Sequence, residues 1–267
     1  MIEMLQSGFM QRAFLGGIMV AYLAGFFGVF VVQRGLSFLG NGLAHAAFGG
    51  VALGILLQRE PLWIAVPFTV VVALGIVWLT EKTRLGADTS IGIFFSVSMA
   101  LGIIFLSQTE RFTTDAFAYL FGSILAVRWS DIYVTAVLVA LSVGAWRWWG
   151  SWAYATFDRE LAQSDRVACL RGDYVLAVAI AVTIVVSMKL VGITLIAAFL
   201  VIPAATARLL SATFRAMTLI SVGIGVGSVL IGLVFSWQYD LPSGPCVILT
   251  QAAAFALAFA VRALRAG

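Results

Sequence analysis

Long apolar runs follow one another along this chain, separated only by short breaks of charge, glycine or proline. Each run is close to the roughly 20 residues that a helix needs to cross the hydrocarbon core of a bilayer. Backbone polar groups inside a membrane must be bonded within the protein, so runs of this length indicate helices. We predict an all-α integral membrane protein, a polytopic bundle of nine transmembrane helices, or eight if one segment fails to cross. The expected spans are 13–33, 37–57, 62–80, 90–107, 131–149, 173–190, 192–211, 216–237 and 245–261.

The composition excludes most other classes of protein. Hydrophobic residues make up 62% of the 267 residues and charged residues only 10%, which is far more apolar than a soluble domain. A membrane barrel would show short alternating strands instead. The net charge of +4 reflects loop arginines, so we expect no nucleic-acid partner. The first apolar run continues past Phe30 without a cleavage pattern, so we expect no signal peptide. Cys169 and Cys246 are too few for a disulfide framework and receive no role.

The distribution of cations predicts the orientation. If all nine spans cross and the long loop at 150–172 is cytoplasmic, eleven of the sixteen Lys and Arg residues lie inside and five outside, as the positive-inside rule requires. The N-terminus is then outside and the C-terminus inside. The inside cations are Arg34, Lys82, Arg84, Arg147, Arg159, Arg166, Arg171, Arg208, Arg215, Arg262 and Arg265, and the outside cations are Arg12, Arg59, Arg111, Arg128 and Lys189.

Three local patterns refine the helix assignment. The apolar stretch from Val175 to Leu210 would be about 54 Å long as one helix, too long for a hydrocarbon core of roughly 30 Å, so we expect a turn at 189–192. Residues 116–127 are apolar but too short to cross, which favours an interfacial or re-entrant helix. Two glycine pairs at GxxxG spacing predict close helix packing; they are Gly50 with Gly54 and Gly223 with Gly227.

The charged residues bear on the energy source. All twelve carboxylates fall at predicted span ends or in loops, whereas ion-coupled carriers usually hold acids within the membrane. This disfavours a secondary metal-ion carrier, and an intramembrane enzyme would need reactive groups in mid-span. The chain also has no GxxxxGK[ST] phosphate loop. We therefore expect no catalytic residues and no enzymatic activity, and any ATP hydrolysis must be carried out by a separate chain.

A polar stripe marks the second span. Ser37, Asn41, His45 and Gly49 recur every four residues, so they share one helix face in an otherwise apolar segment. His45 is the only histidine, and imidazole is the commonest neutral ligand of transition metals. Two interpretations stay open, a transient metal ligand on a pore-facing stripe and a histidine hydrogen-bonded between helices for packing.

The loop at 150–172 has helix-forming character. Asp158 and Glu160 stand near the start of its charged part and Arg166 and Arg171 near the end, which complements a helix dipole. Phe157, Leu161 and Ala168 form an apolar stripe at helical spacing. Taken alone, the pattern also fits a solvated linker.

Over nearly its whole length the chain resembles the permease subunits of the metal-ion ABC transporter family, the zinc, manganese and iron importers. The order and spacing of several blocks carry this resemblance. They are Val31–Ser37 with Ala44-His45, Asp88–Ser96, Phe117–Gly122, Phe157–Ala162, Lys189–Gly192 through Pro203 to Arg208, and Phe235–Asp240 with Pro242 and Gly244.

The resemblance implies a single permease domain over 1–267 in a bacterial inner membrane. It also implies a homodimer, a cytoplasmic ATPase that binds ATP, and an extracytoplasmic metal-binding protein, with no cofactor bound by this chain. His45 and Asn41 would line the path of a divalent metal. The loop would dock on the ATPase through Phe157, Asp158, Glu160, Leu161 and Arg166, while Gly192, Pro203, Arg208, Asp240, Pro242 and Gly244 would be structural.

The chain departs from the family at two positions. Many members carry aspartate where this chain has Asn41 and Ser123. Asn41 can offer a carbonyl oxygen but no charge to a divalent cation. The Phe235–Gly244 pattern resembles the zinc permeases, so we expect zinc, with manganese or iron as the alternative.

Overall fold

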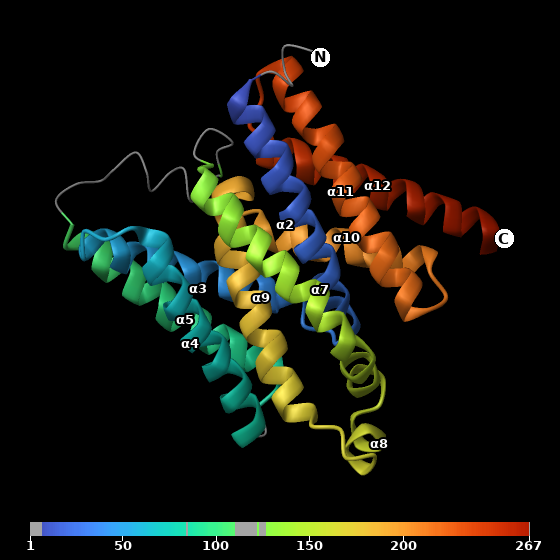
Figure 1. Cartoon of the computed structure of the whole chain (residues 1–267). Coiled ribbons are helices and arrows are strands. Elements are labelled where there is room, and N and C mark those ends of the chain that lie inside the picture. Colours follow the sequence, from blue (N-terminus) through green and yellow to red (C-terminus); the bar gives the residue numbers. More distant parts are fainter. Residues whose placement is uncertain (1–6, 84, 110–121, 123–126, 267) are drawn as a thin grey trace.

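The computed structural model describes residues 7–83, 85–109, 122 and 127–266, and this part of the chain is helical with short connections (Figure 1). Nine of its helices are long and apolar enough to cross a membrane, which confirms the predicted fold class. The helices are α2 (Gly8–Gln33), α3 (Ser37–Leu56), α4 (Pro61–Lys82), α5 (Ala87–Ser107), α7 (Trp129–Phe157), α8 (Arg159–Ser164), α9 (Cys169–Val191), α10 (Ile196–Leu210), α11 (Phe214–Tyr239) and α12 (Ser243–Ala266).

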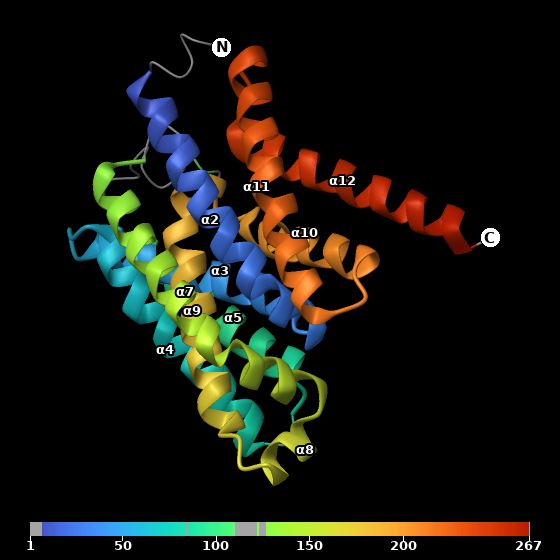
Figure 2. The same ribbon diagram turned by 45° about the vertical axis from the view of Figure 1, so that its right-hand side comes forward.

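The helices form three groups around a common core. In the view of Figure 1, α3, α4 and α5 lie on one side, α2, α7 and α9 in the middle, and α10 to α12 on the other side. Both views show α12 leading away from the bundle (Figures 1 and 2). Apolar side chains of α2 and α9 supply much of the core, and Phe26, Phe30, Ile184 and Met188 are almost fully buried. The more exposed helices α5, α7 and α12 leave apolar surface at the periphery, as expected for a protein whose solvent is lipid.

The small residues of α3 bring three helices into backbone contact. A Cβ atom added at Gly50 would lie 2.6 Å from Cα of Ala65 in α4, and one at Gly49 would lie 2.7 Å from the Ser98 carbonyl oxygen in α5. Glycine allows such an approach because it has no side chain. The close packing predicted for Gly50 and Gly54 is confirmed, and we call α3, α4 and α5 the α3–α5 unit. The prediction for Gly223 and Gly227 is wrong, because a Cβ atom added at either glycine would meet no atom of another described helix within 4 Å.

The long apolar stretch folds back where its length requires. α9 ends at Val191, and Gly192 follows with φ +90° and ψ 148°, a conformation essentially reserved for glycine. Gly122, from a block of the family resemblance, lies against this turn, since a Cβ there would lie 2.7 Å from the carbonyl carbon of Val191. Val127, the last residue of the predicted re-entrant segment, is buried, and its carbonyl oxygen accepts a hydrogen bond from Arg12 at 3.1 Å. Residues 116–121 and 123–126, Ser123 included, lie outside the described residues.

The remaining residues predicted to be structural lie at bends and helix ends. Pro203 is buried inside α10, and Arg208 is exposed in the last turn of that helix. Asp240 ends α11 in the left-handed region with φ +53°. Pro242 and Gly244 then flank the first residue of α12.

Replacing Gly192 with alanine should destabilise the protein by about 1–3 kcal/mol, because a side chain is strained at this backbone conformation. The melting temperature of the purified permease in detergent, followed by the loss of its monodisperse elution peak, measures this effect. Gly223→Ala is the matched control, since a Cβ there meets open space. Equal melting temperatures for both variants would contradict the assigned role of Gly192.

The largest difference between a predicted and an observed boundary lies at the end of the fifth span. The fifth span was expected to end at 149, but α7 continues to Phe157, so residues 150–157 of the expected loop are helical. Gly150 does not end the helix and no proline follows it in this stretch, and a helix of 29 residues reaches about 43 Å, beyond the hydrocarbon core. The extra turns carry the chain from the membrane to α8.

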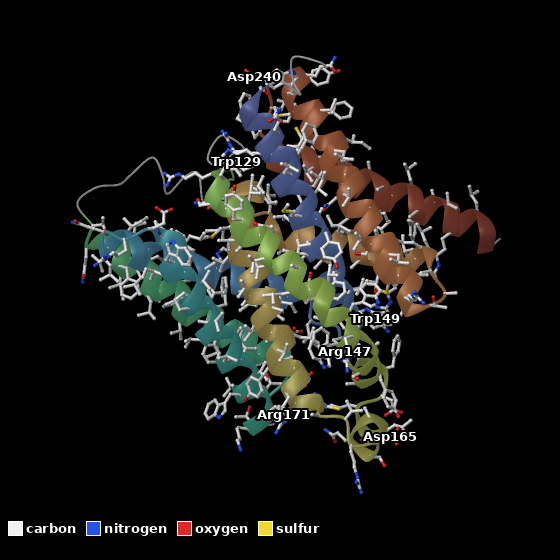
Figure 3. All side chains as sticks on the ribbon, in the orientation of Figure 1. Trp129, Arg147, Trp149, Asp165, Arg171 and Asp240 are labelled. Atoms are coloured by element: carbon white, nitrogen blue, oxygen red, sulfur yellow. The ribbon has the colours of Figure 1, made fainter. Side chains whose placement is uncertain are left out.

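Ion pairs at the two ends of the bundle agree with the alternating course of the helices. Arg34, Glu81, Arg159 and Asp173 meet at one end. At the other end, Lys189 pairs with Glu60 and Asp131, and Glu60 also pairs with Arg128. Figure 3 shows Arg147, Asp165 and Arg171 toward the first end and Trp129 and Asp240 toward the second. Each ion pair therefore joins residues that the sequence analysis places on the same side of the membrane. This agreement supports the predicted number of crossings in the chain between the paired residues.

Candidate metal pathway and coupling loop

The polar stripe of the second span lies on α3, as the spacing predicts. Gly35 forms the turn before the helix with φ +70°, and α3 then carries the stripe without interruption. Asn41 and His45 are half-buried, and Ser37 is exposed. Gly49 differs from the prediction because it is buried against α5. The open part of the stripe thus ends at His45.

His45 has one aromatic neighbour on α5. Its ring lies edge-on to Phe95, with 4.9 Å between the ring centroids, so the imidazole is held in place while remaining half-buried. No group of three His, Cys, Asp or Glu side chains that could hold a metal ion is present in the described part of the chain. His45 and Asn41 of one chain therefore offer one imidazole nitrogen and one amide oxygen, which is fewer than a divalent metal requires.

The loop after α7 contains a short helix with a polar cap. Asp158 accepts a hydrogen bond from the backbone N–H of Leu161 at 2.9 Å and caps α8. Glu160 lies in the first turn, as the dipole argument predicts. Phe157 and Leu161 are 59% and 51% exposed, so apolar surface faces outward at this end. The ring of Phe157 lies edge-on to the ring of Phe214, with 5.4 Å between the ring centroids.

The second half of the loop differs from the prediction. α8 ends at Ser164, and Arg166 has φ +61°, so Arg166 follows the helix instead of completing it. Ala168 precedes α9, and Arg171 belongs to α9. Tyr154 of α7 donates a hydrogen bond to Asp165 at 2.6 Å. This bond holds the end of α8 beside α7. Phe157, Leu161 and Ala168 therefore do not share one helix face.

Sequence reasoning missed the residues that anchor the loop. Arg159, between two predicted coupling residues, pairs with Asp173 of α9 at 2.7 Å and with Glu81 of α4. Burial alone would lower the pKa of Arg159, but the carboxylates of Asp173 and Glu81 raise it above its usual value, so the guanidinium stays charged. No local pattern could reveal these partners, because Glu81 is 78 positions away.

A second charged cluster lies at the opposite end of the bundle. Lys189, in the last turn of α9, is 7% exposed and its Nζ atom lies 3.0 Å from Asp131, which is 8% exposed. Glu60 lies 3.5 Å from the same nitrogen. Asp131 also accepts a hydrogen bond from the backbone N–H of Arg128 at 3.0 Å. Like the other carboxylates in the described part of the chain, Asp131 and Glu60 lie at a helix end or in a loop, so the predicted absence of acids from mid-span is confirmed there.

Removing one member of the Lys189–Asp131 pair should destabilise the protein more than removing both. Lys189→Met leaves a buried carboxylate without its cation, a change that costs about 3–5 kcal/mol in buried pairs. The double variant with Asp131→Asn should recover part of the loss. Thermal stability of the four proteins of this double-mutant cycle gives the result, and additive losses would show that the two side chains do not interact.

Comparison with known proteins places the chain in a family. Residues 6–262 match the model described as the ABC 3 transport family. The chain belongs to this family. The high-affinity zinc uptake system membrane protein ZnuB of Haemophilus influenzae is 35% identical to this ABC 3 permease, over 92% of the chain and 94% of ZnuB. The manganese transport system membrane protein MntC of Listeria innocua is 34% identical, over 96% of the chain and 91% of MntC.

A solved structure supports the same conclusion. PsaBC from Streptococcus pneumoniae in complex with Fab contains a chain that is 32% identical, with a TM-score of 0.86 over 97% of this chain and 94% of that one. The predicted membership of the metal-ion ABC permeases is therefore confirmed. This ABC 3 permease is a multi-pass membrane protein and a transport subunit, not an enzyme.

Proposed function

We propose that this permease conducts zinc through an ATP-driven importer and works as a homodimer. The observation that carries the proposal is the position of His45, a half-buried imidazole on the open side of α3, one helical turn from the amide of Asn41. Imidazole nitrogen binds zinc well. A site with few strong ligands also suits an ion in transit, which must bind and leave.

The donor count supports a pathway between two copies of the chain. Zinc usually takes four ligands in proteins, and one chain presents a single histidine with Asn41. A two-fold axis beside α3 would bring the same face of both copies together, as in any isologous dimer. Two imidazole nitrogens and two amide oxygens would then surround the path.

The other partners follow from the permease class and the exposed loop. A chain without a phosphate loop needs a separate cytoplasmic ATPase, of which we expect two copies, one docked on each α8. Metal would arrive from an extracytoplasmic binding protein at the opposite end. The exposed apolar side chains of Phe157 and Leu161 favour a docking surface over a solvated linker, since such groups are commonly buried in a partner.

The choice of zinc rests on the donor chemistry. Zinc and manganese relatives are 35% and 34% identical, so identity does not separate the two ions. Manganese favours carboxylate oxygens, whereas imidazole suits zinc, and Asn41 supplies a neutral oxygen. Manganese and iron remain the alternatives within the same class.

Uptake by proteoliposomes that contain the permease and its ATPase, with metal supplied on the extracytoplasmic binding protein, tests this function. We expect ATP-dependent zinc uptake that exceeds manganese uptake, and no uptake when a sodium or proton gradient replaces ATP. Asn41→Asp should shift the preference toward manganese, because a carboxylate one turn from His45 adds charge. Faster manganese than zinc transport by the unaltered protein would overturn the zinc assignment, and gradient-driven uptake would favour a secondary carrier.

A further inference from the structure

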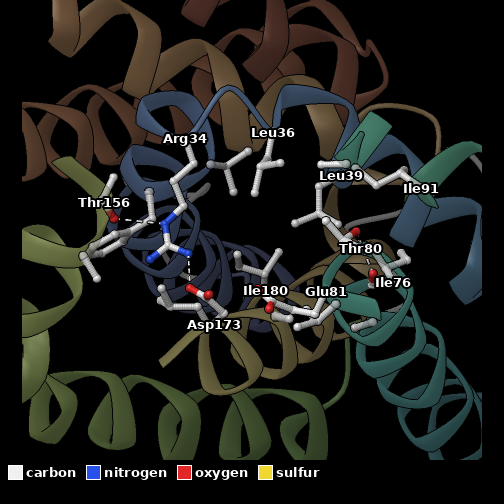
Figure 4. A pocket seen from close by; sticks show the side chains of 18 of the residues that line it. Arg34, Leu36, Leu39, Ile76, Thr80, Glu81, Ile91, Thr156, Asp173 and Ile180 are labelled. Carbon is white, nitrogen blue, oxygen red and sulfur yellow. Dashed lines mark hydrogen bonds and ion pairs between the residues drawn. The ribbon is translucent and has the colours of Figure 1, made fainter. Parts of the chain in front are cut away.

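A cavity of about 350 Å³ lies at the end of the bundle that holds α8, where α2, α3, α4, α5, α7 and α9 converge. Its walls are mostly apolar, with Leu39, Ile76 and Ile180 among them (Figure 4). Its charged lining residues form one group, namely Arg34, Glu81, Arg159 and Asp173. An apolar space of this size between packed helices leaves room for α4 and α9 to move relative to each other.

The four charges form a continuous chain of ion pairs across this space. Glu81 of α4 pairs with the Nη2 atom of Arg159, and the Nη1 atom of Arg159 lies 2.7 Å from Asp173 of α9. The other carboxylate oxygen of Asp173 lies 2.5 Å from Arg34, whose Nε atom donates a hydrogen bond to Thr156 at 2.9 Å. The planar guanidinium of Arg159 thus binds two helices at once, which an ammonium group would do with less geometric definition.

Arg159 is also the first residue of α8. In the described part of the chain, all ion pairs between α8 and other helices run through this side chain. The remaining polar anchors of α8 are local, since Asp158 caps it and Tyr154 of the adjoining α7 binds Asp165. A displacement of α8 would therefore act on α4 through the pair of Arg159 with Glu81, and on α9 through the pair with Asp173.

The contacts of α4 connect this pair with the candidate metal pathway. A Cβ atom at Gly54 of α3 would lie 2.7 Å from Cα of Pro61, and one at Gly50 would lie 2.6 Å from Cα of Ala65. Helices in backbone contact at two successive turns have no side-chain layer between them that could absorb a shift. Movement of α4 must then carry α3, with Asn41 and His45, along with it.

We propose that Arg159 is a positioning residue that transmits the displacement of α8 to the α3–α5 unit, and so to the face that carries Asn41 and His45. The proposal rests on the proposed function, because α8 is displaced only if an ATPase docks on it. Arg159 itself touches neither metal nor nucleotide in this scheme. Its role is to join the moving loop to the helices that line the path.

Neutral variants of the two partners test the proposal in the reconstituted complex. Arg159→Gln and Glu81→Gln should each lower metal uptake per ATP hydrolysed by about tenfold, within the usual range of coupling between sites, while ATPase co-purification stays unchanged. Lys82→Gln and Arg171→Gln are matched controls, since both cations are exposed and neither forms an ion pair with another described residue.

A distance measurement separates transmission from simple structural support. Spin labels on Gln163 of α8 and Trp78 of α4, with Cys169 and Cys246 replaced by alanine, should keep their separation when ATP binds to the otherwise unaltered complex. In Arg159→Gln the separation should change, because α8 moves without α4. Unimpaired uptake in Arg159→Gln, or a separation that responds to ATP equally in both proteins, would overturn the proposal. Absence of ATP-dependent uptake in the unaltered complex would instead overturn the proposed function.

Discussion

His45→Ala should abolish metal uptake, with a loss on the order of a hundredfold, since even indirect partners of a metal ligand are worth about 10–100-fold. The amount of folded permease and the basal ATP hydrolysis by its ATPase partner should stay normal. The physical reason is that His45 supplies the imidazole nitrogen on the open stripe of α3, where Asn41 alone offers a weak neutral oxygen. Uptake of radioactive zinc into proteoliposomes, normalised to the amount of permease, measures the effect.

His45→Phe separates ligation from packing. A phenyl ring can keep the edge-on contact with Phe95, but it has no nitrogen. If His45 is a ligand, this variant should be as inactive as His45→Ala and as stable as the unaltered protein. If His45 only packs, His45→Phe should transport normally and His45→Ala should be unstable. Normal zinc uptake by either variant at the usual protein level would exclude the ligand role and leave the family assignment intact.

Leu161→Asp should release the ATPase. Leu161 is 51% exposed on α8, and a docked partner would bury it in an apolar contact. A carboxylate at such a position must be desolvated without a cation, and central interface residues typically cost 2 kcal/mol or more when altered, about a 30-fold loss of affinity. Co-purification of the ATPase with tagged permease should fall accordingly, and ATP-dependent uptake should fall with it.

The control for this variant is Leu57→Asp. Leu57 is 53% exposed at the opposite end of the bundle, so the same chemical change there should leave ATPase binding intact. Charge is tested separately with Arg166→Glu, because Asp158→Lys would also remove the cap of α8. Unchanged ATPase binding in both Leu161→Asp and Arg166→Glu would show that α8 is not the docking helix.

Several features of the fold could be predicted because they depend on local composition and on the thickness of a membrane. The spans follow from apolar length, and the turn at Gly192 follows because the stretch from Val175 to Leu210 exceeds one crossing. The stripe of Asn41 and His45 follows from helical periodicity. The extension of α7 to Phe157 was missed, because a helix can continue past the hydrocarbon core without an apolar signal.

Other features were decided only by how the helices pack. Gly50 and Gly223 occupy the same kind of motif, yet only Gly50 meets a neighbouring backbone. Arg159 is one more charge in a polar loop until the fold places Glu81 and Asp173 beside it. Apolar length and short-range periodicity are enough to predict the helices, their alternation across the membrane and the polar face of α3. The ion pairs that join α8 to α4 and α9, and the backbone contacts that join α4 to α3, depend on contacts between distant segments, which leave no local pattern and arise only in the packed structure.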